Sequence, residues 1–156
     1  MKRIFQSIAL LAILMGLVGG SAVAGEDLTA QELDLNPEGA AYEIHADALG
    51  NLWISDYFAG ELWRYDPVQD EITAYGVGGY PMDAHADGAG FVWWTDGTSL
   101  GKLDIDNETM QTWQIPGSSF LWGLTIDENR IVWIADSDSF NSATLFSFTP
   151  STKDVC

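Results

Sequence analysis

A short motif that recurs at a constant spacing of 40 residues constrains the fold of this chain more than any other feature. The motif reads LWISD at 52–56, VWWTD at 92–96 and VWIAD at 132–136. A repeat of about 40 residues with several short strands in each copy is typical of one blade of a β-propeller. The sequence therefore predicts an all-β fold, a propeller of four-stranded antiparallel blades of which about three are present.

Each copy divides into short apolar runs separated by turn residues, the pattern of consecutive hairpins. In the first copy the predicted strands are Tyr42–Ala46, Asn51–Asp56, Glu61–Tyr65 and Ile72–Tyr75. The predicted units are an N-terminal outer strand within 25–40 (around Leu33-Asp34-Leu35), blade 1 at 41–80, blade 2 at 81–120 and an incomplete blade 3 at 121–156. Because three blades are too few to close a ring, we expect a piece of a longer propeller. The alternative is that two chains assemble one ring.

The first 24 residues have the composition of an export signal. Lys2 and Arg3 precede an apolar run at 8–18, and Ala22-Val23-Ala24 forms a small-residue cleavage site. The run is too short for a comfortable membrane span, and no second run follows. We therefore expect a secreted, periplasmic or cell-surface protein without an integral membrane span after removal of residues 1–24.

The chain is strongly acidic. It contains 23 Asp and Glu against 6 Lys and Arg, a net charge of -17 at pH 7. Such a surface repels phosphate backbones, which excludes nucleic acid as a partner. The acidity either serves solubility or gathers a cation. The single cysteine, Cys156, allows no disulfide within this sequence.

Residues repeated at the 40-residue spacing are best explained by structural roles. Trp53, Trp93 and Trp133 are predicted core residues, since a large ring at a fixed blade position fills the space between sheets. Asp47, Asp87 and Asp127 are predicted to open turns. His45 and His85 are expected to be hydrogen-bonded interior histidines. The segment 104–108 resembles a calcium loop only faintly, because it lacks the glycine and the distant acid.

Hairpin symmetry predicts a binding rim at one end of the blades. Residues equidistant from a hairpin turn face each other, which pairs Tyr42 with Asp56, Met82 with Asp96 and Trp122 with Asp136. The predicted ligand contacts on this rim are Tyr42, Met82, Trp122 and Trp94. The predicted metal ligands are Asp56, Asp96 and Asp136, for magnesium or calcium. The alternative is that these carboxylates cap strand ends.

The blade pattern resembles the streptogramin (virginiamycin B) lyase family, and is related to that of NHL-type and gluconolactonase-like propellers. The resemblance rests on DALGNLWISD at 47–56, RYDP at 64–67, TAY at 73–75 and PMDA at 81–84, and it covers the chain from about residue 31 onward. It implies a seven-bladed propeller in which a histidine base, an acid and a divalent metal open a cyclic ester by elimination.

Carried over to this chain, the family's acid position corresponds to Asp56, Asp96 and Asp136, and its histidine position to Tyr42, Met82 and Trp122. None of the latter three can act as that base. Two functions follow as expectations. The favoured one is an exported propeller that binds a small-molecule ligand or another propeller chain. The alternative is a metal-assisted lyase or lactone-cleaving enzyme whose catalytic residues lie mostly outside the visible blades.

Overall fold

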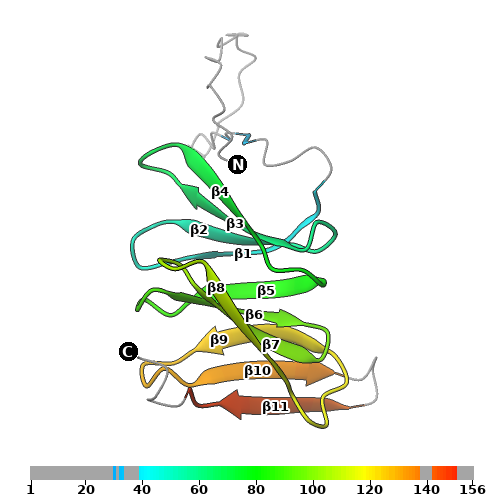
Figure 1. Ribbon diagram of the computed structural model, residues 1–156. Coiled ribbons are helices and arrows are strands. Elements are labelled where there is room, and N and C mark those ends of the chain that lie inside the picture. Colours follow the sequence, from blue (N-terminus) through cyan, green and yellow to red (C-terminus); the bar gives the residue numbers. More distant parts are fainter. Residues whose placement is uncertain (1–29, 31, 34–38, 138–141, 151–156) are drawn as a thin grey trace, which may run out of the picture.

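The computed structural model describes residues 30, 32–33, 39–137 and 142–150, and this part of the chain is built from β-strands without a helix (Figure 1). It therefore contains no helix that is long and apolar enough to cross a membrane. The predicted signal peptide, most of the predicted outer strand and the end of blade 3 lie outside the described residues. Leu33, the first residue of the predicted outer-strand motif, is described and lies outside the strands.

Three antiparallel sheets follow one another along the chain, each a simple meander, as the repeat predicts. The strands of the first sheet are β1 (Ala41–Ala46), β2 (Leu52–Asp56), β3 (Glu61–Asp66) and β4 (Glu71–Gly76). Those of the second are β5 (Pro81–Ala86), β6 (Phe91–Asp96), β7 (Ser99–Asp104) and β8 (Thr109–Gln114). Those of the third are β9 (Leu121–Ile126), β10 (Val132–Ser137) and β11 (Ala143–Phe148).

The sheets stack face to face as the blades of a partial propeller, which confirms the predicted fold class (Figure 1). The first strands of successive blades lie together, β1 against β5 and β5 against β9. The first strand of each blade is therefore the hub strand, and residues on β1, β5 and β9 meet across blade boundaries.

Buried side chains fill the two boundaries between blades. Between blades 1 and 2 the core contains Trp53, Leu62, Tyr75, Ala84, Val92, Trp94 and Leu103. Between blades 2 and 3 it contains Trp93, Leu100, Leu121, Leu124, Val132 and Ile134. Trp53 and Trp93 are almost fully buried, and Trp133 is half-buried. The alternation of side chains along a strand explains why neighbouring Trp93 and Trp94 face opposite boundaries.

The repeated aspartates organise the turn that follows each hub strand. Asp47 Oδ1 accepts hydrogen bonds from the backbone N–H groups of Leu49 and Asn51, at 2.9 Å each, and Oδ2 accepts one from the indole Nε1 of Trp53 at 3.1 Å. In blade 3 the indole of Trp133 donates to Asp127 Oδ2 at 3.0 Å. The predicted turn role is confirmed. In blades 1 and 3 the same carboxylate also joins the turn to the blade's tryptophan, which the sequence did not predict.

A β-bulge at the far end of each hub strand shifts the observed register by one residue from the predicted hairpin pairing. Three pairs in blade 1 follow the predicted hairpin symmetry, from Ala46↔Leu52 to Ile44↔Ile54, but Asp56 then lies opposite Ala41 instead of Tyr42. The same one-residue shift places Pro81 opposite Asp96 and Leu121 opposite Asp136. Because side chains alternate between faces, the shift changes which residues reach the blade end.

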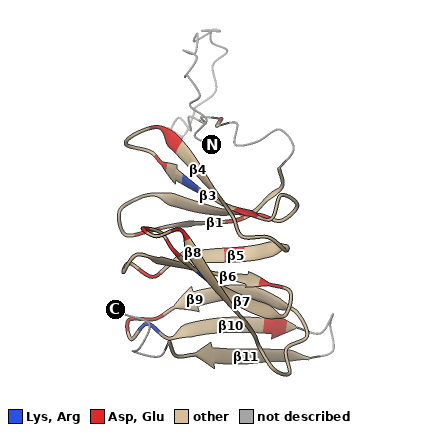
Figure 2. Ribbon diagram, in the orientation of Figure 1, with Lys and Arg blue, Asp and Glu red and all other residues tan. Residues whose placement is uncertain are grey.

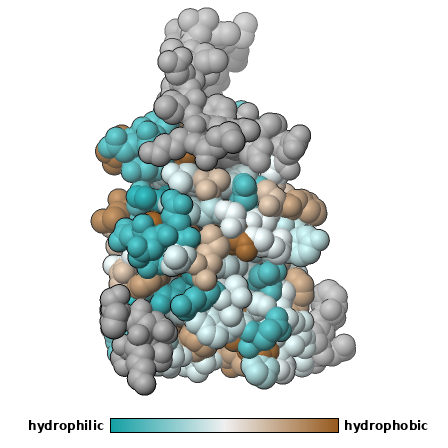
Figure 3. Space-filling view, viewed as in Figure 1, coloured by the Kyte–Doolittle hydropathy of each residue, from teal (hydrophilic) through white to brown (hydrophobic). Residues whose placement is uncertain are grey.

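Charged residues in this fold lie mainly at strand ends and turns, where Figure 2 shows acidic residues on both sides of the stack and few basic ones. On the face seen in Figure 3, hydrophilic and apolar residues are interspersed. One ion pair joins blades 2 and 3, from Arg130 Nη2 to Asp87 Oδ2 at 2.7 Å. The apolar boundaries, rather than surface charge, therefore hold the blades together.

Substitution of Trp93 by alanine is expected to destabilise the chain by about 3–5 kcal/mol, because it leaves a cavity between blades 2 and 3. The matched control is Trp122→Ala, since Trp93 is 2% exposed and Trp122 is 46% exposed. Trp122→Ala is expected to cost less than about 1 kcal/mol. Chemical denaturation followed by far-UV circular dichroism measures both. Equal losses for the two variants would contradict the blade-boundary role of Trp93.

Substitution of Asp47 by asparagine is expected to lower stability in a pH-dependent way. Burial alone would raise the pKa of Asp47, but the hydrogen bonds from Asn51, Trp53 and Leu49 hold the pKa below its ordinary value of 3.8. The folded state therefore gains stability from this carboxylate above pH 3.8, and the gain is lost as the pH falls through the folded-state pKa.

The difference in denaturation midpoint between the unmodified chain and Asp47→Asn should consequently be larger at pH 7 than at about pH 2.5. Glu128→Gln, which neutralises an exposed acid in the equivalent turn of blade 3, is the control and should change the midpoint little. A difference for Asp47→Asn that is the same at both pH values would contradict the role given to the ionised carboxylate.

Candidate functional site

One end of the blades holds the three carboxylates that the sequence assigned to a binding rim. The rim is defined here by Asp56, Asp96 and Asp136, which end or nearly end β2, β6 and β10, and by the segments that lead into β1, β5 and β9. In Figure 1 it lies at the right, where the arrows of β6 and β10 point. It is the place where the chain passes from one blade to the next.

The rim carboxylates bind the backbone of these connecting segments. Oδ1 of Asp56 accepts hydrogen bonds from the N–H groups of Ala40, Phe58 and Ala59 at 3.0–3.1 Å. Oδ1 of Asp96 accepts one from Tyr80 N–H at 3.0 Å, and Oδ1 of Asp136 accepts those of Ser119 and Phe120 at 2.8 and 2.7 Å. This is the capping geometry that the sequence left as the alternative to a metal site.

Glycine is required in the segment that meets Asp96. Gly79 has a φ of 65°, in the left-handed region, and a Cβ atom there would overlap the carboxylate of Asp96. The Gly78-Gly79-Tyr80 sequence therefore allows the backbone to approach Asp96 closely and leaves the Tyr80 ring on the outside, 57% exposed.

An aromatic cluster covers the rim of blades 1 and 2. The ring of Tyr57 lies 5.7 Å from Tyr42, 5.1 Å from Phe58 and 5.1 Å from Tyr80, measured between centroids. Tyr42, Phe58 and Tyr80 are exposed. The aromatic rim cluster, defined as Tyr42, Tyr57, Phe58 and Tyr80, therefore presents a group of ring faces to solvent.

A second aromatic pair lies on the rim of blade 3. The rings of Phe120 and Trp122 are 4.9 Å apart, and Trp122 is exposed. Of the ligand contacts predicted from the sequence, Tyr42 and Trp122 thus lie at the surface of the rim. Tyr57, Phe58, Tyr80 and Phe120 were missed, because they belong to turns and connecting segments rather than to the repeated strands. The 40-residue spacing of Tyr80 and Phe120 was an available signal.

Met82 and Trp94, the other two predicted ligand contacts, lie in the core. They are 2% and 1% exposed, respectively. The bulge places Pro81 rather than Met82 opposite Asp96, and the indole of Trp94 lies over Gly101 on β7, where a Cβ atom would overlap it. Neither side chain can contact a ligand at the rim in this arrangement.

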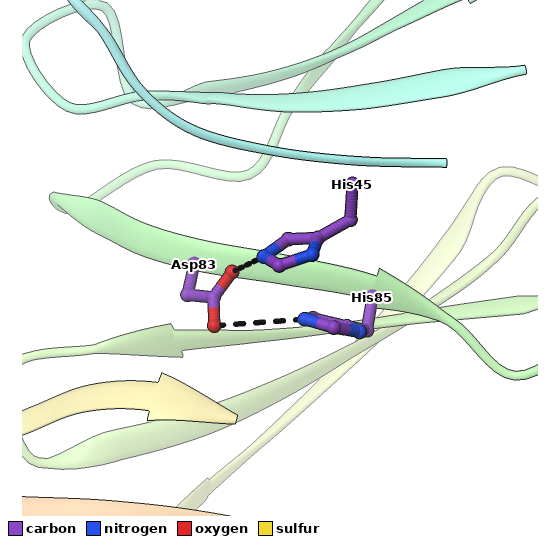
Figure 4. A group of neighbouring side chains, drawn as sticks. All are labelled: His45, Asp83 and His85. Carbon is purple, nitrogen blue, oxygen red and sulfur yellow. Dashed lines mark ion pairs between the residues drawn. The ribbon is translucent and has the colours of Figure 1, made fainter. Parts of the chain in front are cut away.

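A second group of polar side chains lies farther along the hub strands. His45 on β1 and Asp83 and His85 on β5 lie close together across the boundary between blades 1 and 2 (Figure 4). The imidazole Nε2 of His45 is 2.9 Å from Asp83 Oδ1, and Nε2 of His85 is 3.8 Å from Asp83 Oδ2. The two imidazole rings are 3.6 Å apart between centroids.

The electrostatics of this group favour a neutral His85. Burial lowers the pKa of His85 below its ordinary value of 6.5, the Asp83 carboxylate opposes that shift, and the nearby His45 adds to it. The Nε2 atom of His85 is buried and has no hydrogen-bond partner in the described part of the chain. The expectation of hydrogen-bonded interior histidines thus fits the contact of His45 with Asp83 but leaves His85 unexplained.

Within the described residues, these three form the only group of three or more His, Cys, Asp or Glu side chains whose ligand atoms all lie within 4.8 Å of one another. Asp56, Asp96 and Asp136 do not form such a group, so the magnesium or calcium site assigned to them stays a prediction. Asp83 was not among the predicted site residues, because its equivalents, Glu43 and Gly123, break the repeat. The 40-residue spacing of His45 and His85 was the available signal.

Comparison with solved structures finds lyases of the propeller class. A catalytically inactive variant of virginiamycin B lyase from Staphylococcus aureus, solved with quinupristin, matches with a TM-score of 0.57 and 15% identity over 76% of this chain. A streptogramin B lyase structure matches with a TM-score of 0.55 and 18% identity over 72% of this chain. The extracellular domain of a putative hybrid two-component system from B. thetaiotaomicron matches with a TM-score of 0.54 and 19% identity over 70%.

No protein-family model and no curated protein match the chain. The matched parts make up 44% and 41% of the two lyase chains and 15% of the two-component system domain, so this chain spans less than half of each of these proteins. At these identities the likeness establishes architecture rather than activity. The chain has the blade fold of the virginiamycin B lyase-like β-propellers.

Proposed function

We propose that this chain belongs to an exported β-propeller that binds a small molecule with apolar or aromatic faces at the rim. The aromatic rim cluster of Tyr42, Tyr57, Phe58 and Tyr80 is the observation that carries the proposal. Exposed aromatic rings that contact one another offer a large binding surface at low conformational cost. Propeller folds carry many functions, so the choice rests on these side chains and not on the fold.

The position of the cluster supports this function. Its rings come from three separate segments: the start of β1, the turn between β2 and β3, and the connection to β5. The rim carboxylates hold these segments through backbone hydrogen bonds, from Ala40 and Phe58 to Asp56 and from Tyr80 to Asp96. The ring faces are therefore placed by fixed backbone, which reduces the ordering cost of binding.

Export is part of the proposal and rests on the N-terminal signal pattern, Lys2 and Arg3 followed by the apolar run and Ala22-Val23-Ala24. An exported acidic propeller would meet ligands outside the cytoplasm, and one of the structural matches is likewise an extracellular domain.

The alternative function is a metal-assisted lyase, and the fold likeness to virginiamycin B lyase is the observation that favours it. In this chain the positions equivalent to the family's histidine base are Tyr42, Met82 and Trp122. The equivalent acids already accept backbone hydrogen bonds. The described blades therefore supply binding surface but no general base at that position.

The test is binding of quinupristin to the full chain, measured by isothermal titration calorimetry. We expect saturable binding that Tyr57→Ala weakens about tenfold, because Tyr57 contacts the other three rings of the cluster. Tyr65→Ala is the matched control. Tyr65 lies at the opposite end of blade 1, opposite Leu52, and should leave the affinity unchanged.

Absence of binding, or equal affinity of the unmodified chain and Tyr57→Ala, would contradict the rim proposal for this class of ligand. Mass spectrometry of the recovered quinupristin separates the two functions. Elimination opens the ring to a linear isomer of the same mass, so chromatographic retention and fragment masses are compared with those of untreated quinupristin. Unchanged retention and fragments indicate binding alone, and the linear isomer indicates the lyase.

A further inference from the structure

The group formed by His45, Asp83 and His85 has the geometry of an ion-binding site. Both imidazoles direct Nε2 toward the two oxygens of one carboxylate, as Figure 4 shows, and all three ligand atoms lie within 4.8 Å of one another. A tetrahedral ion bound at about 2.0–2.1 Å keeps its ligand atoms roughly 3.3 Å apart. The two imidazole nitrogens lie 2.9 and 3.8 Å from different oxygens of the carboxylate, Oδ1 and Oδ2. The imidazole rings are 3.6 Å apart between centroids, so they must rotate apart for both nitrogens to bind one tetrahedral ion.

The carboxylate is held in place by two blades. Asp83 Oδ1 accepts a hydrogen bond from the N–H of Ala84 at 2.8 Å, and Oδ2 accepts one from the N–H of Leu124 on β9 at 2.8 Å. Asp83 is itself almost fully buried. Outer hydrogen bonds of this kind fix the orientation of a metal ligand.

A purely structural hydrogen-bond network would account for only part of this arrangement. His45 donating to Asp83 satisfies one imidazole, but the buried Nε2 of His85 has no hydrogen-bond partner among the described residues and lies 3.8 Å from Asp83 Oδ2. Buried polar atoms are normally paired, because an unpaired one keeps its full desolvation cost. An ion between the three ligand atoms would satisfy His85 and use the same carboxylate.

We propose that His45, Asp83 and His85 bind a divalent transition-metal ion, Zn²⁺ before others, at the hub between blades 1 and 2. Two imidazole nitrogens and one carboxylate oxygen suit zinc and related ions, whereas magnesium and calcium prefer oxygen ligands. The net charge of -17 raises the local concentration of cations. Both imidazole side chains are partly exposed, 35% for His45 and 22% for His85, although the Nε2 atom of His85 is itself buried.

This site is separate from the lyase-like positions on the rim and from the aromatic rim cluster. His45 and His85 lie three residues beyond Tyr42 and Met82, the positions equivalent to the family's base. The ion would join blade 1 to blade 2 at the hub, so it would stabilise the fold whether or not a small molecule binds at the rim.

The experiment is zinc titration of the metal-stripped full chain, produced without a polyhistidine tag, in competition with a chromophoric zinc chelator. Magnesium is present in millimolar excess to occupy the acidic surface. We expect one high-affinity Zn²⁺ per chain, and His85→Ala should weaken its binding by at least about tenfold. Co²⁺ in place of Zn²⁺ should give the visible absorption of a four-coordinate site, and His85→Ala should abolish it.

Two further variants complete the test: one removes a second proposed ligand, and the other is a control outside the site. His45→Ala removes the ligand on the other blade and should weaken zinc binding similarly, even if Asp83→Asn fails to fold. Asp104→Asn removes an acidic side chain on β7, outside the cluster, and should leave zinc binding unchanged. The absence of a one-to-one complex, or equal zinc affinity in the unmodified chain, His45→Ala and His85→Ala, would overturn the proposal.

Discussion

The packing of each blade against the next is the interaction on which the rest of this structure depends. A single meander has two faces, and a sheet of three or four short strands cannot bury both by itself. Trp53, Tyr75 and Trp94 close the boundary between blades 1 and 2, and Trp93 closes the next one with Leu124 and Ile134. The hub strands meet only because these side chains hold the sheets together. Every candidate site described here lies where two blades meet.

Polar contacts refine this packing at the same boundaries. The hydroxyl of Ser55 donates to the carbonyl of Met82 at 2.9 Å, and that of Thr95 donates to the carbonyl of Trp122 at 3.0 Å, so one contact is repeated 40 residues apart. Asp83 departs from the repeat and binds both neighbours, through His45 and through Leu124 N–H. The repeated residues thus build the blades, and Asp83, which departs from the repeat, brings together the polar group of His45, Asp83 and His85 at the hub.

Rim and hub offer different chemistry on the same scaffold. The rim presents aromatic rings on segments fixed by capping carboxylates, which suits recognition of apolar surface. The hub presents nitrogen and oxygen ligands around a buried carboxylate, which suits an ion. Asp56 and Asp136, which the family resemblance marked for metal chemistry, accept hydrogen bonds from backbone N–H groups in this chain. The histidines that the repeat marked as structural are the ones gathered around a carboxylate.

The sequence by itself determined the blade architecture, the strand positions and the turn role of Asp47 and Asp127, because these depend on local periodicity and turn chemistry that repeat every 40 residues. Tertiary structure decided the rest. The bulge in each hub strand, invisible in a symmetric hairpin pattern, moved Met82 away from the position opposite Asp96. The meeting of His45 with Asp83, and of Tyr57 with Tyr80, depends on how neighbouring blades dock. The repeat marks the spacing of His45 and His85, but it does not mark Tyr57, whose equivalent is Gly97, and it does not predict contacts between blades.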